Sequence, residues 1–312
     1  MEKIKESASA IALIECADRR GIIAAVSAAL ADMDANITQA DEHTDVDGRF
    51  FMRLAFTWRG GDTTLTALEN GLRAALGPGS VLRTRQTRQV QNGDSGAPCP
   101  DALEPFTMRV YAAEKRPAMG ILVSRADHCL VELLYRHRAG ELAADIPFIA
   151  GNHDTLAPVA ASYGIPFYHI PITKETKPEA EARLLEIAAG RCDFLVLARY
   201  MQILSADFIE RFGGDIINIH HSFLPSFMGA DPYRQAWERG VKIIGATAHY
   251  VTEKLDEGPI IEQIVERVSH RDDVDSLRRK GKNLERQALY TAILAHTERR
   301  ILRCRNKTIV FA

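Results

Sequence analysis

Hydrophobic positions follow two alternating periods in the first ninety residues. Apolar residues recur every three or four positions in residues 20–33 and 65–76, which predicts two amphipathic helices. Residues 49–58 alternate with a period of two, which favours a half-buried strand. Further short runs suited to strands occupy residues 9–16, 36–46 and 80–90. The order βαββαβ that results is the ferredoxin-like, split βαβ arrangement.

The pattern changes after residue 90. Residues 91–105 are rich in Gly, Pro and Asp and hold almost nothing to bury, which is typical of a linker. From residue 119 onward, continuous apolar runs alternate with helical stretches, such as residues 127–139, which Gly140 ends. This order predicts a mainly parallel, Rossmann-like sheet covered on both faces, with the ligand at the carboxyl ends of the strands. The expected strands are residues 119–123, 146–150, 167–170, 194–198 and 216–219.

The chain is therefore expected to be an α/β protein with two unequal domains. Its 312 residues already suggest two domains by length alone. We expect the first domain over residues 1–90 and a linker over residues 91–116, which includes a joining strand at residues 106–112. The second domain would span residues 117–312.

Composition and charge narrow the class of protein. The chain is 46% hydrophobic and 26% charged, with 39 Lys and Arg against 41 Asp and Glu, so no net field attracts nucleic acid or an anionic membrane. The five cysteines form no Cys-x-x-Cys pair, and no run of about 18 apolar residues could span a bilayer. We expect a soluble cytoplasmic protein without nucleic-acid or membrane partners.

The densest polar chemistry lies in residues 217–225, Ile-Asn-Ile-His-His-Ser-Phe-Leu-Pro. Asn218 and His220 stand two apart on an expected strand, so their side chains leave the same face. Downstream, the acidic loop 251–259 follows a strand that carries His249, and such a loop suits a general base. An amide, an imidazole and a carboxylate together suit a tetrahedral acyl-transfer intermediate. Singly, each residue also fits a structural role, as a satisfied core histidine or a capping aspartate.

No catalytic metal is expected. His220 and His221 are adjacent but point to opposite faces of a strand, and no His-Glu-x-x-His motif or Cys/His cluster accompanies them. Cys129, in the first turns of an expected helix, fits a small buried hydrophobe better than a nucleophile.

Residues 218–225, together with Asp256 in Leu-Asp-Glu-Gly-Pro-Ile-Ile, resemble the formyltransferase family that uses 10-formyltetrahydrofolate. A closer resemblance, to the formyltetrahydrofolate deformylases, covers nearly the whole chain. Its other motifs are at residues 18–21, 48–53, 127–130, 152–154, 198–204 and 245–251. The resemblance implies that Asn218 and His220 donate to the formyl oxygen as it becomes an oxyanion. It also implies that Asp256 orients His220 and accepts the proton of the attacking water.

The same resemblance implies a substrate pocket. Residues 201–204 would sandwich the pterin ring and read its edge through backbone groups, and the loop 251–256 would close the other side. No cofactor would stay bound, because 10-formyltetrahydrofolate is the substrate and water the co-substrate. Asp127 is equally explained as a helix N-cap, and His249 as a support for Asp256. The implied substrate-binding residues are Met201, Gln202, Ile203, Leu204, His221, Glu253, His249 and Asp127.

The formyl acceptor distinguishes members of the family. Glycinamide ribonucleotide formyltransferase, which resembles the second domain, has a glycine-rich phosphate loop after its first strand. Residues 123–130 contain no glycine here, so we expect water as the acceptor and hydrolysis to formate and tetrahydrofolate. This reaction would balance one-carbon folate pools and supply formate for purine synthesis. Two alternatives stay open: formyl transfer to a non-nucleotide amine, and a catalytically silent amino-acid-sensing protein.

The first domain resembles an ACT domain, a regulatory module that commonly pairs with another copy and binds an amino acid at the interface. Asp18 to Gly21 would form the loop after the first strand, where glycine permits close backbone approach, and Asn36 would be a further ligand contact. The resemblance implies an amino-acid effector and a homo-oligomer. A domain that serves only assembly fits nearly as well.

Overall fold

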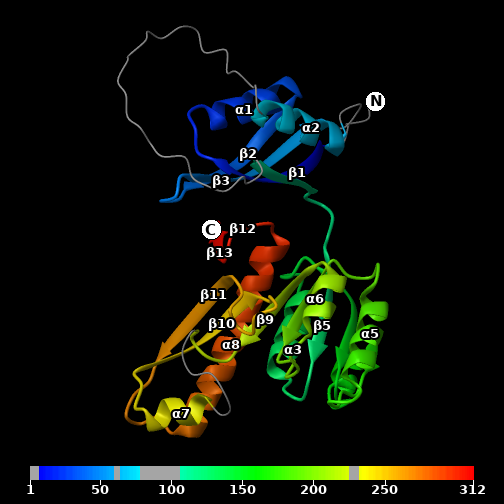
Figure 1. Ribbon diagram of the computed structural model, residues 1–312, viewed down its shortest axis with the longest axis vertical. Helices are drawn as coiled ribbons and strands as arrows, with labels where there is room; N and C mark the ends of the chain where they lie inside the picture. The colour runs from blue at the N-terminus through cyan, green and yellow to red at the C-terminus, as the bar shows by residue number, and fades with distance from the viewer. Residues whose placement is uncertain (1–6, 60–63, 78–105, 225–231) are drawn as a thin grey trace. The chain divides into compact units, whose positions relative to one another are not determined.

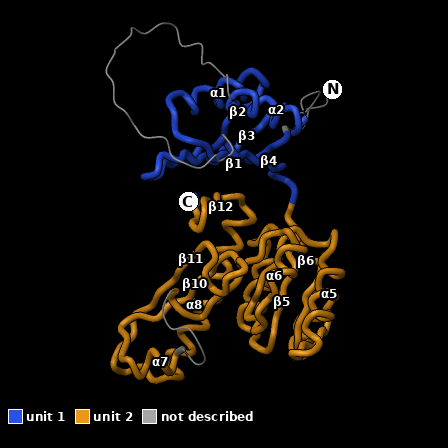
Figure 2. Tube along the Cα trace, in the orientation of Figure 1, with its two compact units in different colours: residues 1–115, 311 blue, residues 116–310, 312 orange. Residues whose placement is uncertain are grey.

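The computed structural model describes residues 7–59, 64–77, 106–224 and 232–312 (Figure 1). These residues form two compact units, of which the first ends at Lys115 and the second begins at Arg116 (Figure 2). Each unit has a hydrophobic core of its own. No helix in the described ranges is both long and apolar enough to cross a membrane.

The first unit is a four-stranded antiparallel sheet in the order β2-β3-β1-β4, packed against two helices. Its elements are β1 (Ser7–Ala17), α1 (Ile22–Asp32), β2 (Ala35–Thr44), β3 (Arg49–Arg59), α2 (Leu65–Leu76) and β4 (Phe106–Ala112). The apolar faces predicted for the two helices are buried. The core contains Ile22, Val26 and Leu30 of α1 and Leu68 and Leu72 of α2. The predicted ferredoxin-like arrangement is confirmed.

The fourth strand of this sheet is β4, which pairs with β1 along its whole length. It lies inside the 91–116 segment that was expected to be linker, so the sheet extends further along the chain than residue 90. Met108 is buried, with Phe106 and Val110 packed on the same core, which is the period-two pattern of an edge strand with one buried face. The strand predicted at residues 80–90 lies outside the described residues.

The second unit is built on a seven-stranded sheet in the order β11-β10-β9-β8-β5-β6-β7. The first five strands along the chain are parallel, as predicted, and the last two are antiparallel to their neighbours. The strands are β5 (Ala118–Val123), β6 (Asp145–Gly151), β7 (Phe167–His169), β8 (Phe194–Ala198), β9 (Asp215–His220), β10 (Ile243–Tyr250) and β11 (Ile260–Arg267). Strand order reverses between β5 and β8, which is where such sheets bind their ligands.

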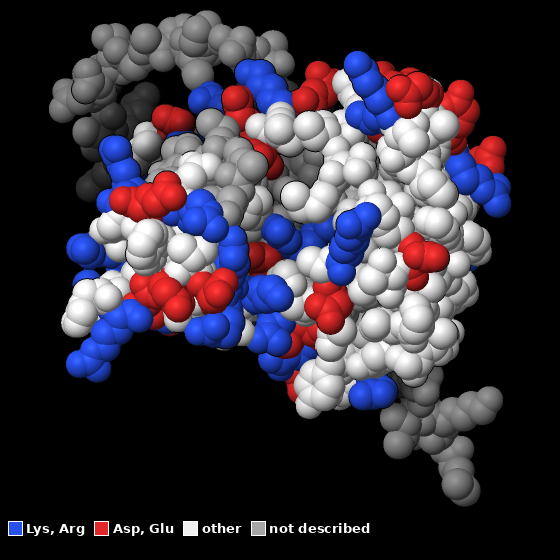
Figure 3. Space-filling view, turned by 90° about the horizontal axis from the view of Figure 1, so that it is seen from below, with Lys and Arg blue, Asp and Glu red and all other residues white. Residues whose placement is uncertain are grey.

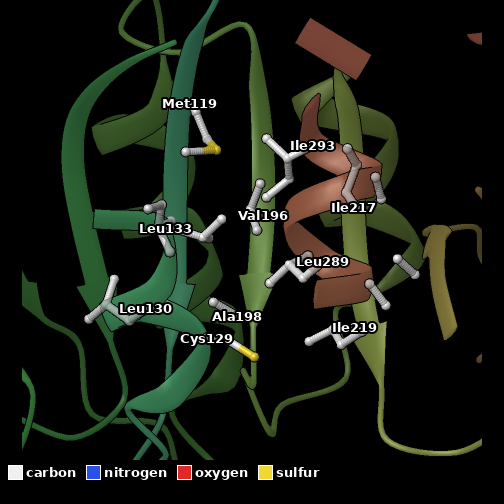
Figure 4. Close-up of a cluster of buried hydrophobic side chains, with 14 of the residues drawn as sticks. Met119, Cys129, Leu130, Leu133, Val196, Ala198, Ile217, Ile219, Leu289 and Ile293 are labelled. Atoms are coloured by element: carbon white, nitrogen blue, oxygen red, sulfur yellow. The ribbon is translucent and has the colours of Figure 1, made fainter. Parts of the chain in front are cut away.

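Helices cover both faces of this sheet (Figure 1). They are α3 (His128–Arg138), α4 (Ala157–Ser162), α5 (Lys177–Ala188), α6 (Ala206–Phe212), α7 (Pro232–Glu238) and α8 (Val274–Thr297), followed by the hairpin β12 (Ile301–Cys304) and β13 (Lys307–Val310). On one face, α3 and α8 pack on β5, β8 and β9, as Figure 4 shows for Cys129, Val196, Ile217 and Ile293. On the other face, α5 and α6 pack on β5, β6 and β8.

The two faces of β9 have different surroundings, and this difference positions the site. Ile217 and Ile219 are buried in the core beneath α8. Asn218 and His220 therefore leave β9 on the opposite face. Acidic and basic side chains are mixed over the surface shown in Figure 3, in keeping with the net charge of −2.

Candidate active site

Two strands and one loop bring the polar residues of the second unit together. Asn218 lies directly across from His249 in the antiparallel β9–β10 pair, so both side chains point to the same face of the sheet. The loop after β10 folds back over this face and carries Asp256 to His220, with Oδ2 3.2 Å from the imidazole Nδ1. Asp256 Oδ1 lies 3.6 Å from His249 Nε2. Asn218, His220, His249 and Asp256 thus surround one small volume.

Asp256 adopts a backbone conformation that is unusual for a residue with a side chain, with φ at 56°. Non-glycine residues held in this region cluster at functional sites, where the surrounding structure supports the strain. The hydrogen bond with His220 holds the pKa of Asp256 well below its usual range despite its partial burial. Asp256 is therefore a carboxylate at neutral pH.

The imidazole of His220 is fixed at one nitrogen only. Because a carboxylate can only accept, Nδ1 donates its proton to Asp256. Nε2 is buried and has no hydrogen-bond partner within the described part of the chain. A buried polar atom without a partner is rare in folded proteins, so this nitrogen is a candidate contact for a bound ligand.

His249 orients Asn218. Its Nδ1 lies 2.9 Å from the carbonyl oxygen of Tyr250, which accepts, so this nitrogen carries the proton. In the neutral ring the other nitrogen, Nε2, then accepts from Asn218 Nδ2 at 3.2 Å. One of the two N–H groups of the Asn218 amide is thereby fixed, and the second remains for a ligand.

A pocket of about 240 Å³ opens beside these residues. Its walls are the segment after β8, the end of β9 and the loop after β10. Met201 and Ile203, on the first of these, are 60% and 59% exposed, which is unusual for apolar side chains and suits a flat, apolar ligand. The lining residues are Leu197, Arg199, Tyr200, Met201, Gln202, Ile203, Leu204, Asn218, Ile219, His220, His221, His249, Val251, Thr252, Glu253, Lys254, Leu255 and Asp256.

All but one of the residues expected to act in the second domain line this pocket. Asp127 is the exception: it occupies the N-cap position of α3, where its side chain makes no capping hydrogen bond. The candidate regulatory residues lie in the first unit. Gly21 precedes α1 with a φ of 90°, a conformation that glycine adopts without strain, Asp18 donates its backbone N–H to Gly48, and Asn36 lies in β2.

A second polar group adjoins the pocket, and sequence reasoning did not select it. The carboxylate of Glu285 on α8 accepts from His128 Nε2 and from the Tyr233 hydroxyl, each at 2.7 Å. Arg199, which lines the pocket, places Nε 3.3 Å from the same carboxylate. Burial lowers the pKa of the neighbouring His221 to about 4, and the charge of Arg199 adds to this effect. The sequence feature that could have indicated this group is Arg199, a charged residue directly after the fully apolar strand β8.

His128, Cys129 and Glu285 also bring one potential metal ligand each within 4.8 Å of one another. The surroundings do not favour a cation. Burial raises the pKa of the Cys129 thiol strongly, so that it stays protonated, and the Arg199 guanidinium already neutralises Glu285. Cys129 is fully buried.

This combination of a mainly parallel sheet, a pocket at the carboxyl ends of β8 and β9 and an Asn-His-Asp set defines a formyltransferase-type domain. The family model described as formyl transferase matches residues 119–293, and that of the ACT domain matches residues 10–67. The chain is 46% identical over 301 residues to a formyltetrahydrofolate deformylase of Mycobacterium bovis, which covers 96% of this chain and 89% of the relative. The chain therefore belongs to the formyltetrahydrofolate deformylase family.

Solved structures agree with this assignment. A formyltetrahydrofolate deformylase from Pseudomonas syringae superposes with a TM-score of 0.85 at 37% identity, over 99% of this chain and 96% of that one. A glycinamide ribonucleotide transformylase from Symbiobacterium toebii matches with a TM-score of 0.59 at 28% identity, over 63% of this chain and 95% of that one. The second match therefore extends over only part of this chain.

Proposed function

We propose that the protein hydrolyses 10-formyltetrahydrofolate to tetrahydrofolate and formate, with water as co-substrate and no permanently bound cofactor. The observation that carries this proposal is the buried, unpartnered Nε2 of His220, beside the Asn218 amide and opposite the Asp256 carboxylate. The family membership supplies the substrate class. We expect the pterin ring to lie against residues 201–204 and the formyl group against Asn218 and His220, all of which line the pocket.

The reaction then follows from the charges of the site. Water attacks the formyl carbon, and the carbonyl oxygen becomes an oxyanion that accepts from Asn218 Nδ2 and from Nε2 of the protonated His220. The Asp256 carboxylate stabilises the imidazolium and accepts the proton of the attacking water. When the C–N bond breaks, the proton moves to N10 of the folate. Formic acid loses its own proton, so the products are formate, a proton and tetrahydrofolate.

Formate release from 10-formyltetrahydrofolate tests this proposal, with the wild type compared with Asp256→Asn. The amide keeps the size of the carboxylate but cannot accept a proton, so turnover should fall by roughly two to four orders of magnitude. Equal turnover in both proteins would remove Asp256 as the base. Formate that appears only after an amine is added would instead favour formyl transfer to that amine.

The match to the ACT family supports a regulatory role for the first unit. We place an amino-acid effector near Asp18, Gly21 and Asn36, and a second copy of the chain as the partner, with formate supplied to purine synthesis in the cytoplasm. Isothermal titration of the full chain with single amino acids tests the effector. If no amino acid gives a heat of binding, assembly remains as the role of this unit.

A further inference from the structure

The buried carboxylate of Glu285 on α8 is contacted by groups from three other parts of the second unit. It is 1% exposed and contacts His128 of α3, Tyr233 of α7 and Arg199 after β8. Burial by itself would raise its pKa, but the hydrogen bond from His128 and the charge of Arg199 outweigh burial and lower it. A buried ion pair of this kind adds little net stability, because desolvation offsets the attraction. Its position beside the pocket points to a role there.

The geometry places Arg199 in the same pocket as the Asn218–His220 pair. It directly follows β8, whose Leu197 pairs with Asn218 of the parallel neighbour β9, and it lines the pocket together with His220. The Arg199 side chain is 17% exposed and lines the pocket. Its φ of 63° is the strained, left-handed conformation also found at Asp256. The Nε of Arg199 lies 3.3 Å from the Glu285 carboxylate, and the guanidinium has further N–H groups that can donate to a ligand in the pocket.

We propose that Arg199, positioned by Glu285, binds the formate product and selects water over amines as the formyl acceptor. This inference rests on the proposed hydrolysis. Water attack converts the neutral formamide into formate, so a negative charge forms on the acceptor side only when the acceptor is water. A guanidinium is well suited to a carboxylate, which it can contact through two parallel hydrogen bonds.

The same charge rejects the competing acceptors. A primary amine enters at neutral pH as an ammonium ion and has to lose a proton before it attacks the formyl carbon. The Arg199 guanidinium, paired with Glu285, offers the ammonium ion no anionic partner and gains nothing from the neutral amide product. The acceptor side of the pocket therefore favours an uncharged nucleophile that ends as an anion.

The test compares wild type, Arg199→Gln and Arg199→Lys, with Arg211→Gln as the matched control because Arg211 is an exposed arginine on α6. Two quantities are measured at neutral pH: inhibition of turnover by added formate, and the share of formyl groups transferred to added glycinamide. In Arg199→Gln, formate should inhibit at least about tenfold more weakly, the range for losing a hydrogen bond to a charged group. The share of formyl groups transferred to glycinamide should rise in Arg199→Gln. In both quantities, Arg199→Lys should lie between wild type and Arg199→Gln.

Arg211→Gln should match wild type in both quantities. Unchanged formate inhibition in a folded Arg199→Gln, with reduced turnover alone, would overturn the inference and leave Arg199 a structural residue. If Arg199→Gln does not fold, formate is titrated into the wild-type protein saturated with tetrahydrofolate. The absence of formate binding would then also overturn the inference. A wild type that releases no formate from 10-formyltetrahydrofolate contradicts the proposed function itself, which separates the two failures.

Discussion

His220 has one ring nitrogen bound to Asp256 and the other buried without a partner in the described structure. Replacement by alanine removes one of the two oxyanion donors but leaves residues 201–204 intact. We expect the turnover of His220→Ala to fall by a factor of roughly 10² to 10³, with little change in KM for the folate. Steady-state formate release measures both constants. His169→Ala, at an exposed position of β7, is the control, and a raised KM with unchanged turnover would contradict the assigned role.

Single residues also show which parts of the site can be predicted from the sequence and which cannot. Asn218 and His220 were found because a two-residue spacing on a strand fixes a shared face. Arg199 and Glu285 were missed, although they adjoin the same pocket. Glu285 lies 157 positions from His128, its hydrogen-bond partner, and nothing in the local pattern of α8 shows that one carboxylate turns inward. Contacts of that range exist only after folding.

The loop between β10 and β11 is the element that completes the site, and Gly258 determines its path. A Cβ atom at this position would lie 1.7 Å from the Tyr250 carbonyl oxygen, so any side chain has to displace the loop. We expect Gly258→Ala to move Asp256 away from His220 and to lower turnover at least about tenfold, because catalysis is sensitive to shifts near 1 Å. Formate release measures this effect.

The adjacent Glu257→Ala is the matched control for that element. Its side chain is 66% exposed and pairs only loosely with Lys254, so wild-type turnover is expected. Full activity of Gly258→Ala would show that the loop tolerates a different backbone path and that the role of Asp256 does not depend on the observed path.

The strands also mark the limit of local patterns. Parallel strands β5 to β9 were predicted, because strands covered on both faces read as continuous apolar runs. The pairing of β4 with β1 was not, since its neighbours in sequence are residues of linker composition. An edge strand is recognised by its partner, and the partner of β4 is about a hundred residues away.

For the whole molecule, the half-buried His221 and the buried His296 predict sensitivity to acid. Burial lowers the pKa values of His221 and His296 from 6.5 to about 4. Between these values the unfolded chain binds more protons than the folded one, so the free energy of unfolding falls as pH drops from about 6.5 towards about 4. We expect a loss on the order of 1 kcal/mol per histidine at pH 5 relative to pH 7. Asp256 does not contribute, because its stabilisation is lost only below its unfolded pKa of 3.8.

Urea unfolding at pH 7 and pH 5 measures this loss. His296→Gln should reduce the difference between the two pH values, whereas the exposed His169→Gln should leave it unchanged. An identical difference in wild type and His296→Gln would show that other groups dominate the acid response.

The sequence by itself determined the class of each unit, the shared face of Asn218 and His220, and the family. These features depend on periods of two and 3.6 residues and on motifs read within a few positions, which local sterics and burial dictate. Only the tertiary structure decided that β4 completes the first sheet and that Glu285 lies against Arg199 at the pocket. Each of these is a contact between distant segments, and such contacts are selected by the packing of the whole core and not by any local preference.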